Sequence, residues 1–200
     1  MVHGSDGISR KGADPGQASH YYSLTRLATT GTLRLGDEKI AVSGESWFDH
    51  EWATNQLREN QVGWDWFSLQ FQDGSELMLF QLRTKDGGRD PHSAGTFVDA
   101  QGQARPLSAD DFTLEPTEQW KSPASGASYP VAWRLGVKSL ALDVEVRAAA
   151  ENQELLLQPI TYWEGAVRAK GSRGGQTMEA KGYLEMTGYA GAIRGLQEGR

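Results

Sequence analysis

Residues 63–83 read GWDWFSLQFQDGSELMLFQLR, and this stretch decides the fold class. Apolar and polar residues alternate on both sides of the Asp73-Gly74 pair. A period of two is typical of a β-strand, and Asp-Gly between two such runs is the strongest local signal of a β-hairpin with a type I′ turn. The stretch therefore predicts two antiparallel strands, Gly63–Gln72 and Ser75–Arg83, which reverse direction over two residues.

The two faces of this predicted hairpin differ in character. A two-residue turn aligns Phe67 with Phe80 and Asp65 with Leu82. That face is apolar apart from Asp65, whereas the opposite face mixes tryptophans with polar groups and carries Trp64, Trp66, Ser68, Gln70, Leu77, Leu79, Gln81 and Arg83. A ligand cavity needs apolar walls with a few orienting polar groups, so we expect the mixed face to bind a ligand. Alternatively, both tryptophans cover a sheet edge or a domain interface.

Short strand-like segments with turn signals between them recur along the rest of the chain, and no long helix is indicated. Without helical crossovers, such strands pair antiparallel as a meander barrel or a sandwich. The sequence therefore predicts an all-β fold. Its further strand candidates are Ser23–Thr30, Thr32–Leu35, Lys39–Ser43, Thr96–Val98, Asp111–Leu114, Tyr129–Leu135, Leu140–Arg147, Leu155–Tyr162, Gly165–Ala169 and Ala180–Thr187.

The composition excludes several classes of protein. Lys and Arg number 20 against 26 Asp and Glu, and this acidic balance argues against nucleic-acid binding, which needs a basic footprint. No apolar stretch approaches the roughly 18 residues of a membrane-spanning helix. The chain has no cysteine, which excludes disulfides, thiolate metal sites and thiol nucleophiles. Residues 1–11 contain no apolar signal-peptide core.

Several blocks carry a resemblance to a known family. They are Ser9–Gly12, Tyr21–Ser23 with Thr25-Arg26, Gly44–Trp52, Gly63–Phe67, Glu76–Arg83, Asn152–Glu154, Tyr162–Gly165 and Gly182–Tyr189. The chain resembles the AttH-like and hydroxyneurosporene synthase (carotenoid 1,2-hydratase) family, whose members contain two consecutive lipocalin-like domains. The resemblance implies an antiparallel lipocalin-like (calycin) barrel, preceded by remnant strands of another such domain.

The resemblance also implies a division of the chain and a location. Residues 1–20 are expected to be a linker or the end of a shortened N-terminal domain, and residues 21–52 to be strands of that domain or shared with it. Residues 53–190 are expected to form the C-terminal lipocalin-like domain, and residues 191–200 a tail. Relatives of the AttH type are generally exported and encoded beside ABC transporter components. The resemblance thus implies the periplasm or cell envelope, with those components as partners.

The block Trp47–Trp52 holds the groups that hydration chemistry needs. Adding water to an isolated trisubstituted alkene requires an acid, which a buried carboxyl supplies, and aromatic faces that stabilise the cation. In a strand, His50 and Trp52 share one face and Asp49 points to the other. The resemblance associates this region with catalysis, so we expect His50 as acid or base, Asp49 as its partner or the proton donor, and Trp52 as cation stabiliser. Alternatively, His50 is a structural core histidine.

One departure from the hydratases bears on the substrate. Those enzymes carry an acidic pair on the strand after the hairpin, whereas this chain has Gln81 there, and an amide cannot protonate an alkene. Carotenoid hydration is therefore not expected. We expect Asp65 to pair with Arg83 or Arg58 or to lie at the sheet rim. Alternatively, it is a buried acid with a raised pKa. The residues expected to contact a ligand are Trp47, Trp64, Trp66, Phe80, Gln81, Arg83 and Tyr22.

Two functions remain open from the sequence. One is a hydratase- or isomerase-type enzyme, in the first case a hydro-lyase, that needs no cofactor and acts on a terpenoid-like or other hydrophobic substrate. The other is a non-catalytic carrier of a lipid or hydrophobic metabolite. No metal site is predicted, because His3, His20 and His92 lie in loop-like surroundings without paired carboxylates at ligand spacing. No serine-hydrolase elbow or nucleotide-binding fingerprint is present.

Overall fold

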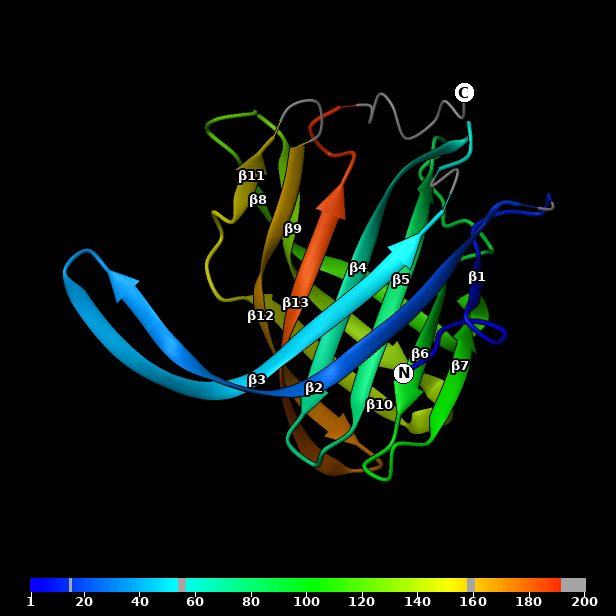
Figure 1. Ribbon diagram of the computed structural model, residues 1–200. Helices are drawn as coiled ribbons and strands as arrows, with labels where there is room; N and C mark the ends of the chain where they lie inside the picture. The colour runs from blue at the N-terminus through cyan, green and yellow to red at the C-terminus, as the bar shows by residue number, and fades with distance from the viewer. Residues whose placement is uncertain (15, 54–56, 158–160, 192–200) are drawn as a thin grey trace.

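The computed structural model describes residues 1–14, 16–53, 57–157 and 161–191, which form two antiparallel sheets (Figure 1). The smaller sheet contains β1 (Ile8–Arg10), β2 (Ala18–Leu35) and β3 (Glu38–Trp52) in that order. The larger sheet has ten strands, β4 (Gln61–Phe71), β5 (Glu76–Thr84), β6 (Ala94–Val98), β7 (Ala104–Ser108), β8 (Phe112–Lys121), β9 (Ser128–Val137), β10 (Leu142–Ala148), β11 (Glu154–Leu156), β12 (Thr161–Arg173) and β13 (Gln176–Thr187). The helical residues among those described are two short 3-10 turns, η1 (Ala109–Asp111) and η2 (Lys138–Leu140).

The larger sheet curls into a barrel around a packed interior. Its strand order is β7-β6-β5-β4-β13-β12-β10-β9-β8, and β11 pairs with β12. Phe67, Tyr129, Trp133 and Trp163 are among the fully buried side chains of the interior cluster. The predicted all-β, antiparallel lipocalin-like fold is therefore confirmed. Because these large side chains fill the barrel, the ligand cavity expected beside Trp64 and Trp66 does not lie in its middle.

The smaller sheet crosses the outer face of the barrel, and in Figure 1 β2 and β3 run over β4, β5 and β13. A second apolar cluster lies between the two sheets and contains Tyr21, Met78, Phe80 and Leu82, with the partly buried Trp64 and Trp66 packed against it. The far ends of β2 and β3 extend beyond the barrel as a two-stranded arm. The fold thus places a second, partly polar layer outside the barrel, and the pocket described below lies there.

The predicted register of the central hairpin was wrong by one residue. The chain reverses over three residues, because the Phe71 N–H donates to the Ser75 carbonyl at 2.9 Å and the left-handed conformation occurs at Gly74 (φ 85°). Phe80 therefore pairs with Trp66, and not with Phe67. A one-residue slip exchanges the two faces of a strand. The slip moves Phe80 to the outer face and turns its neighbour Gln81 towards the barrel interior.

The N-terminal segment is more ordered than a linker. Residues Ile8–Arg10 form β1, and the buried His3 ring lies between the Thr96 hydroxyl (2.9 Å) and the Ser23 hydroxyl (2.7 Å). Contacts with β2 and β6 therefore fix the His3 side chain, although the sequence placed it in loop-like surroundings. The division of the chain into parts of two lipocalin-like domains stays a prediction.

Strand positions were predicted better than strand lengths. The two candidates between Ser23 and Leu35 are one continuous strand, β2, and β1 and β7 were not predicted. Of the candidate Leu155–Tyr162, residues 155–156 lie in β11 and residues 161–162 in β12, while residues 158–160 lie outside the described residues. The expected tail falls almost wholly on residues 192–200, which also lie outside them. Among the described residues, no helix has the length and apolar character needed to cross a membrane.

Candidate functional site

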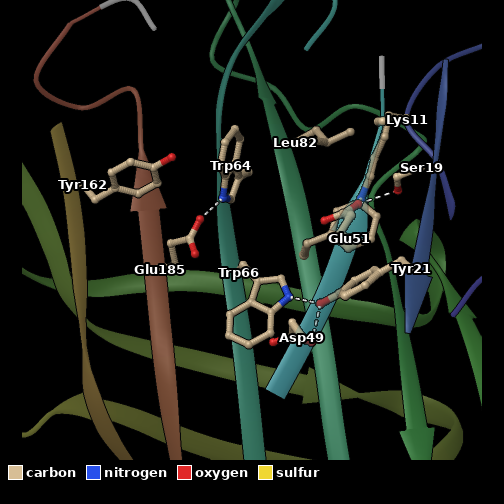
Figure 2. A pocket seen from close by; sticks show the side chains of 12 residues that line it. Lys11, Ser19, Tyr21, Asp49, Glu51, Trp64, Trp66, Leu82, Tyr162 and Glu185 are labelled. Atoms are coloured by element: carbon tan, nitrogen blue, oxygen red, sulfur yellow. Dashed lines mark hydrogen bonds and ion pairs between the residues drawn. The ribbon is translucent and has the colours of Figure 1, made fainter. Parts of the chain in front are cut away.

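A pocket of about 250 Å³ lies between the two sheets, on the outer face of the barrel (Figure 2). Its walls come from β2 and β3 of the smaller sheet, from β4, β5, β12 and β13 of the barrel, and from the segment after β1. The lining residues are Lys11, Ser19, Tyr21, Asp49, Glu51, Ala53, Trp64, Trp66, Phe80, Leu82, Tyr162 and Glu185. Pockets for drug-sized ligands usually have about 300–1,000 Å³, so this one fits a small molecule or one part of a larger molecule.

Asp49 is the centre of a hydrogen-bond network at the floor of the pocket. Its Oδ1 accepts from the Tyr21 hydroxyl at 3.0 Å and from the Ser23 hydroxyl, and its Oδ2 accepts from Trp47 Nε1 at 2.8 Å. The Tyr21 oxygen in turn accepts from Trp66 Nε1 at 2.9 Å. Burial raises the pKa of Asp49, and the three donors oppose that rise. The network fixes Tyr21 with its hydroxyl group at the pocket wall.

Lys11, Ser19 and Glu51 form a second polar group at one side of the pocket. Lys11 Nζ lies 3.0 Å from Glu51 Oε1, which also accepts from the Ser19 hydroxyl at 2.5 Å. The ammonium group lies 3.7 Å from the centre of the Phe80 ring, a cation–π distance. Burial lowers the pKa of Lys11, and the charge of Glu51 opposes that fall.

Glu185 occupies the other side of the pocket. In Figure 2 its carboxyl group points towards Trp64, whose Nε1 donates to Glu185 Oε1 at 2.6 Å. Burial raises the pKa of Glu185 to about 7, and the nearby carboxylates of Glu164, Glu51 and Asp49 raise it further against the Trp64 hydrogen bond. A substantial fraction of Glu185 is therefore protonated at neutral pH, which suits a general acid.

The structure brings four of the predicted residues to the pocket wall. The four are Asp49, Trp64, Trp66 and Phe80. Trp47 does not line the pocket, but it donates a hydrogen bond to Asp49, which does. Phe80 belongs there only because of the register change, since the predicted register put it on the face opposite Trp66. The expectation that the tryptophan-bearing face of the hairpin carries the pocket agrees with this placement.

Three other predicted residues lie on the opposite face of the smaller sheet. His50 and Trp52 are exposed, with ring centres 4.8 Å apart, and the Tyr22 hydroxyl lies 3.2 Å from His50 Nδ1. Strand alternation causes this separation, because Asp49 and Glu51 point towards the barrel and their neighbours point away. None of the three lines the pocket, so its geometry does not support the roles expected of them, which stay predictions.

Gln81 and Arg83 also lie away from the pocket, at the inner face of the barrel sheet, where they contact the fully buried Asp65. Gln81 Nε2 donates to Asp65 at 2.7 Å, the Tyr189 hydroxyl donates at 3.0 Å, and Arg83 Nε lies 3.2 Å from Asp65 Oδ2. The expected ion pair of Asp65 with Arg83 is confirmed. The alternative of a buried acid also fits, because burial raises the pKa of Asp65 against the charge of Arg83. The register change turned Gln81 and Arg83 inwards, away from the pocket between the sheets, so their expected ligand contacts stay predictions.

Sequence reasoning missed the charged and polar side chains that complete the pocket: Lys11, Ser19, Tyr21, Glu51 and Glu185. Glu185 lies in the alternating run 183–189, but alternation alone does not show what covers a face. Tyr21 and Glu51 lie on one face of the smaller sheet, and Tyr22 and His50 lie on the other. The sequence does not show which of these two faces the barrel covers. Within the described residues, no group of three or more histidine and acidic side chains is arranged to hold a metal ion.

Comparisons with known proteins place this geometry in a family. The profile of a family described as AttH-like matches residues 1–189. A crystal structure of an AttH protein from Nitrosomonas europaea is 38% identical and superposes with a TM-score of 0.86, covering 94% of this chain and 58% of that chain. Kievitone hydratase from Nectria haematococca is 19% identical with a TM-score of 0.77 over 95% and 58% of the two chains, a likeness that shows the fold alone.

A curated relative gives a further comparison. Dehydratase asqC of Emericella nidulans is 25% identical over 160 residues, which cover 76% of this chain and 44% of that protein. The chain therefore spans about half the length of the relatives that it matches. Because the AttH-like profile covers nearly every residue, the chain belongs to the AttH-like family.

Proposed function

We propose that this protein catalyses the addition or removal of water on a hydrophobic small molecule without a cofactor, and that Glu185 is its proton donor. The observation that carries the proposal is the carboxyl group of Glu185, which has a pKa of about 7 and faces an aromatic pocket. The relative named dehydratase asqC supports the same class of reaction.

The pocket supplies each group that hydration of a trisubstituted alkene needs. Glu185 gives its proton to the less substituted alkene carbon, and the positive charge develops on the other carbon. The ring faces of Trp64 and Trp66 stabilise that cation, since aromatic quadrupoles attract positive charge. The negative charges of Asp49 and Glu51 also stabilise the cation. The transition state is therefore bound more tightly than the neutral alkene, which is the requirement for catalysis.

Tyr21 and Asp49 receive the proton that the attacking water loses. As the water oxygen bonds to the cationic carbon, its proton passes to the Tyr21 oxygen while the Tyr21 proton passes to Asp49 along their 3.0 Å hydrogen bond. Tyr21 is neutral before and after this relay. Asp49 ends protonated and Glu185 ends as a carboxylate, so one proton has moved between them through the substrate. Dehydration is the same sequence in reverse.

An isotope-exchange assay tests the proposal. The probe is the tertiary alcohol 2-methyl-4-phenylbutan-2-ol in ¹⁸O-labelled water, because each dehydration and rehydration replaces its oxygen, which mass spectrometry detects. We expect exchange above the buffer rate, and the variant Glu185→Gln should lower it by about 10²–10⁴-fold, the usual contribution of a general acid. The matched control is Glu179→Gln on the same strand, whose exposed side chain pairs with Lys170 outside the pocket.

Two outcomes would contradict the proposal. Exchange that is undiminished in Glu185→Gln would remove Glu185 as the acid. If the probe quenches tryptophan fluorescence in the wild-type protein but its oxygen never exchanges, the pocket is a binding site and the carrier function is favoured.

A further inference from the structure

Besides the Asp49 network at its floor, the pocket has polar groups at two opposite ends. Figure 2 shows Glu185, Trp64 and Tyr162 on one side and Lys11, Ser19 and Glu51 on the other. The wall between them is made largely of aromatic and apolar side chains, Trp66, Phe80 and Leu82 among them. The reaction proposed above uses the Glu185 end and the Tyr21–Asp49 pair. It assigns no contact to Lys11.

Lys11 is held in place by contacts on its backbone as well as its side chain. Its N–H donates to the Gln17 carbonyl at 2.8 Å, and its carbonyl accepts from Gln61 Nε2 at 3.0 Å. The side chain is only 12% exposed although lysines are rarely buried. A fixed backbone and a buried stem give the ammonium group a fixed position at the pocket wall.

The ammonium group has capacity for a further partner. It carries three N–H donors, and its described partners are the Glu51 carboxylate at 3.0 Å and the faces of two rings, Phe80 at 3.7 Å and Tyr21 at 5.8 Å. Burial disfavours its charge, as the lowered pKa shows, so an additional oxygen acceptor from a ligand would stabilise it. Such an acceptor would lie at the end of the pocket opposite Glu185.

The charges around Lys11 restrict what that acceptor can be. Glu51 and Asp49 both lie at the same pocket, and their negative charges oppose a ligand carboxylate. A phenol group suits both neighbours, because its oxygen accepts from Lys11 and its hydroxyl hydrogen can be donated to Glu51. A hydrocarbon would leave the Lys11 donor without an acceptor and with less water, which costs free energy.

We propose that Lys11 and Glu51 form a binding subsite for a phenolic hydroxyl, so that the ligand class is an aromatic phenol and not a pure hydrocarbon. The proposal rests on the proposed function only in assuming that the ligand occupies this pocket. It makes Lys11 a specificity-determining residue that has no part in proton transfer.

Binding of three matched probes tests this subsite. Naphthalene, 2-naphthol and 2-naphthoate share one skeleton, and tryptophan quenching or calorimetry measures their affinity for the 200-residue chain. We expect 2-naphthol to bind at least about tenfold more tightly than either of the others, the difference expected from a hydrogen bond to a charged group. Lys11→Met should bring 2-naphthol to within about twofold of naphthalene, and naphthalene affinity should not fall, because the variant has no buried donor for a hydrocarbon to desolvate.

Further variants keep the test decisive. Lys11→Arg retains a cationic donor and should retain a preference for 2-naphthol, and Lys11→Met/Glu51→Gln removes both charges together if the single variant unfolds. Lys121→Met, an exposed position outside the pocket, is the matched control. The proposal is overturned if the wild-type protein binds naphthalene and 2-naphthol equally, or if Lys11→Met keeps the preference.

The outcome is separable from that of the proposed function. The exchange probe 2-methyl-4-phenylbutan-2-ol has no phenol group, so the difference between wild type and Glu185→Gln does not depend on Lys11. Conversely, a preference for 2-naphthol that Lys11→Met abolishes stands even if no exchange occurs.

Discussion

Trp64 Nε1 donates a 2.6 Å hydrogen bond to Glu185 Oε1, and this contact opposes the effect of burial on the pKa of Glu185. The donor favours the carboxylate form, so it lowers the pKa of Glu185 against the larger effect of burial, which leaves the value at about 7. In Trp64→Phe the burial remains and the donor is gone. The pKa of Glu185 should therefore rise further above its ordinary value.

The pH dependence of oxygen exchange checks this prediction. Glu185 and Asp49 share one proton in the proposed cycle, and exchange stops when both are carboxylates, so activity falls as the pH rises through the pKa of Glu185. We expect this fall to occur at higher pH in Trp64→Phe than in the wild-type protein, with a ¹³C NMR titration of the glutamate carboxyl carbons as a direct measurement. A profile that does not move would show that the Trp64 bond has no influence on the active acid.

Neighbouring residues of β3 should differ sharply in their effect on activity. Asp49 faces the pocket and accepts from Tyr21, whereas His50 lies on the exposed face. Asp49→Asn removes the final proton acceptor and should lower oxygen exchange by about 10²-fold or more. His50→Ala leaves every pocket contact in place and should change the rate by less than about twofold. The reverse result would restore the role that the sequence suggested for His50.

The fold class was predictable from sequence because it depends on local signals. Alternation and turn residues identified the strands around Asp73-Gly74 and hence the antiparallel sheet. The register was not predictable in the same way, because two-residue and three-residue reversals both accept this pair of residues. The difference of one residue decides whether Phe80 or Gln81 faces the pocket. The local sequence pattern thus predicts the strands, whereas tertiary packing decides to which face their side chains point.

The composition of the pocket depends on contacts between residues far apart in the chain. Lys11 and Phe80 meet only because the smaller sheet packs across the outside of the barrel. The tryptophans were recognised because two of them on one strand face are unusual in solvent. Lys11 and Glu185 gave no such signal, since a charged residue in a strand is ordinarily exposed.

Removing one partner of the buried ion pair should strongly destabilise the barrel. Asp65 is fully buried and lies 3.2 Å from Arg83 Nε, which has no hydrogen-bond partner within the described structure. Asp65→Asn leaves the guanidinium charge uncompensated and should lower the free energy of unfolding by about 3–5 kcal/mol. Urea denaturation measures this loss, and Asp65→Asn/Arg83→Met should recover part of it. Equal stability of the single variant and the wild-type protein would contradict this account.

Gly188 turns the chain after β13 so that Tyr189 reaches Asp65. Its φ is 75°, and a side chain there would overlap the Val62 carbonyl oxygen. Gly188→Ala should therefore lower the free energy of unfolding by more than about 2 kcal/mol. Gly44→Ala in β3 is the control, because a methyl group there meets open space, and its effect should stay within about 0.5 kcal/mol. Similar urea midpoints for both variants would show that the turn tolerates a side chain.

His3 should make the stability of the protein depend on pH. Burial lowers the pKa of its ring to about 3 from an ordinary value of 6.5, and the ring lies between hydroxyls of β2 and β6. Between these two pH values the unfolded chain binds a proton at His3 that the folded chain does not bind. The free energy of unfolding therefore falls as the pH is lowered from about 6.5 towards 3, and it is unaffected by His3 above that window.

Comparison with His3→Gln isolates this contribution. Each pH unit within the window should cost the wild-type protein up to about 1.4 kcal/mol more than the variant, the free energy of one pKa unit. The raised pKa of Glu185 has the opposite effect between pH 4.5 and 7, because there the folded state binds the extra proton. That effect is common to both proteins and cancels in the difference. Urea denaturation at pH 4, 5, 6 and 7 measures how the free energy of unfolding of each protein depends on pH. Equal slopes for the two proteins would contradict the prediction, because they would mean that the folded protein binds the proton at His3 as readily as the unfolded chain does.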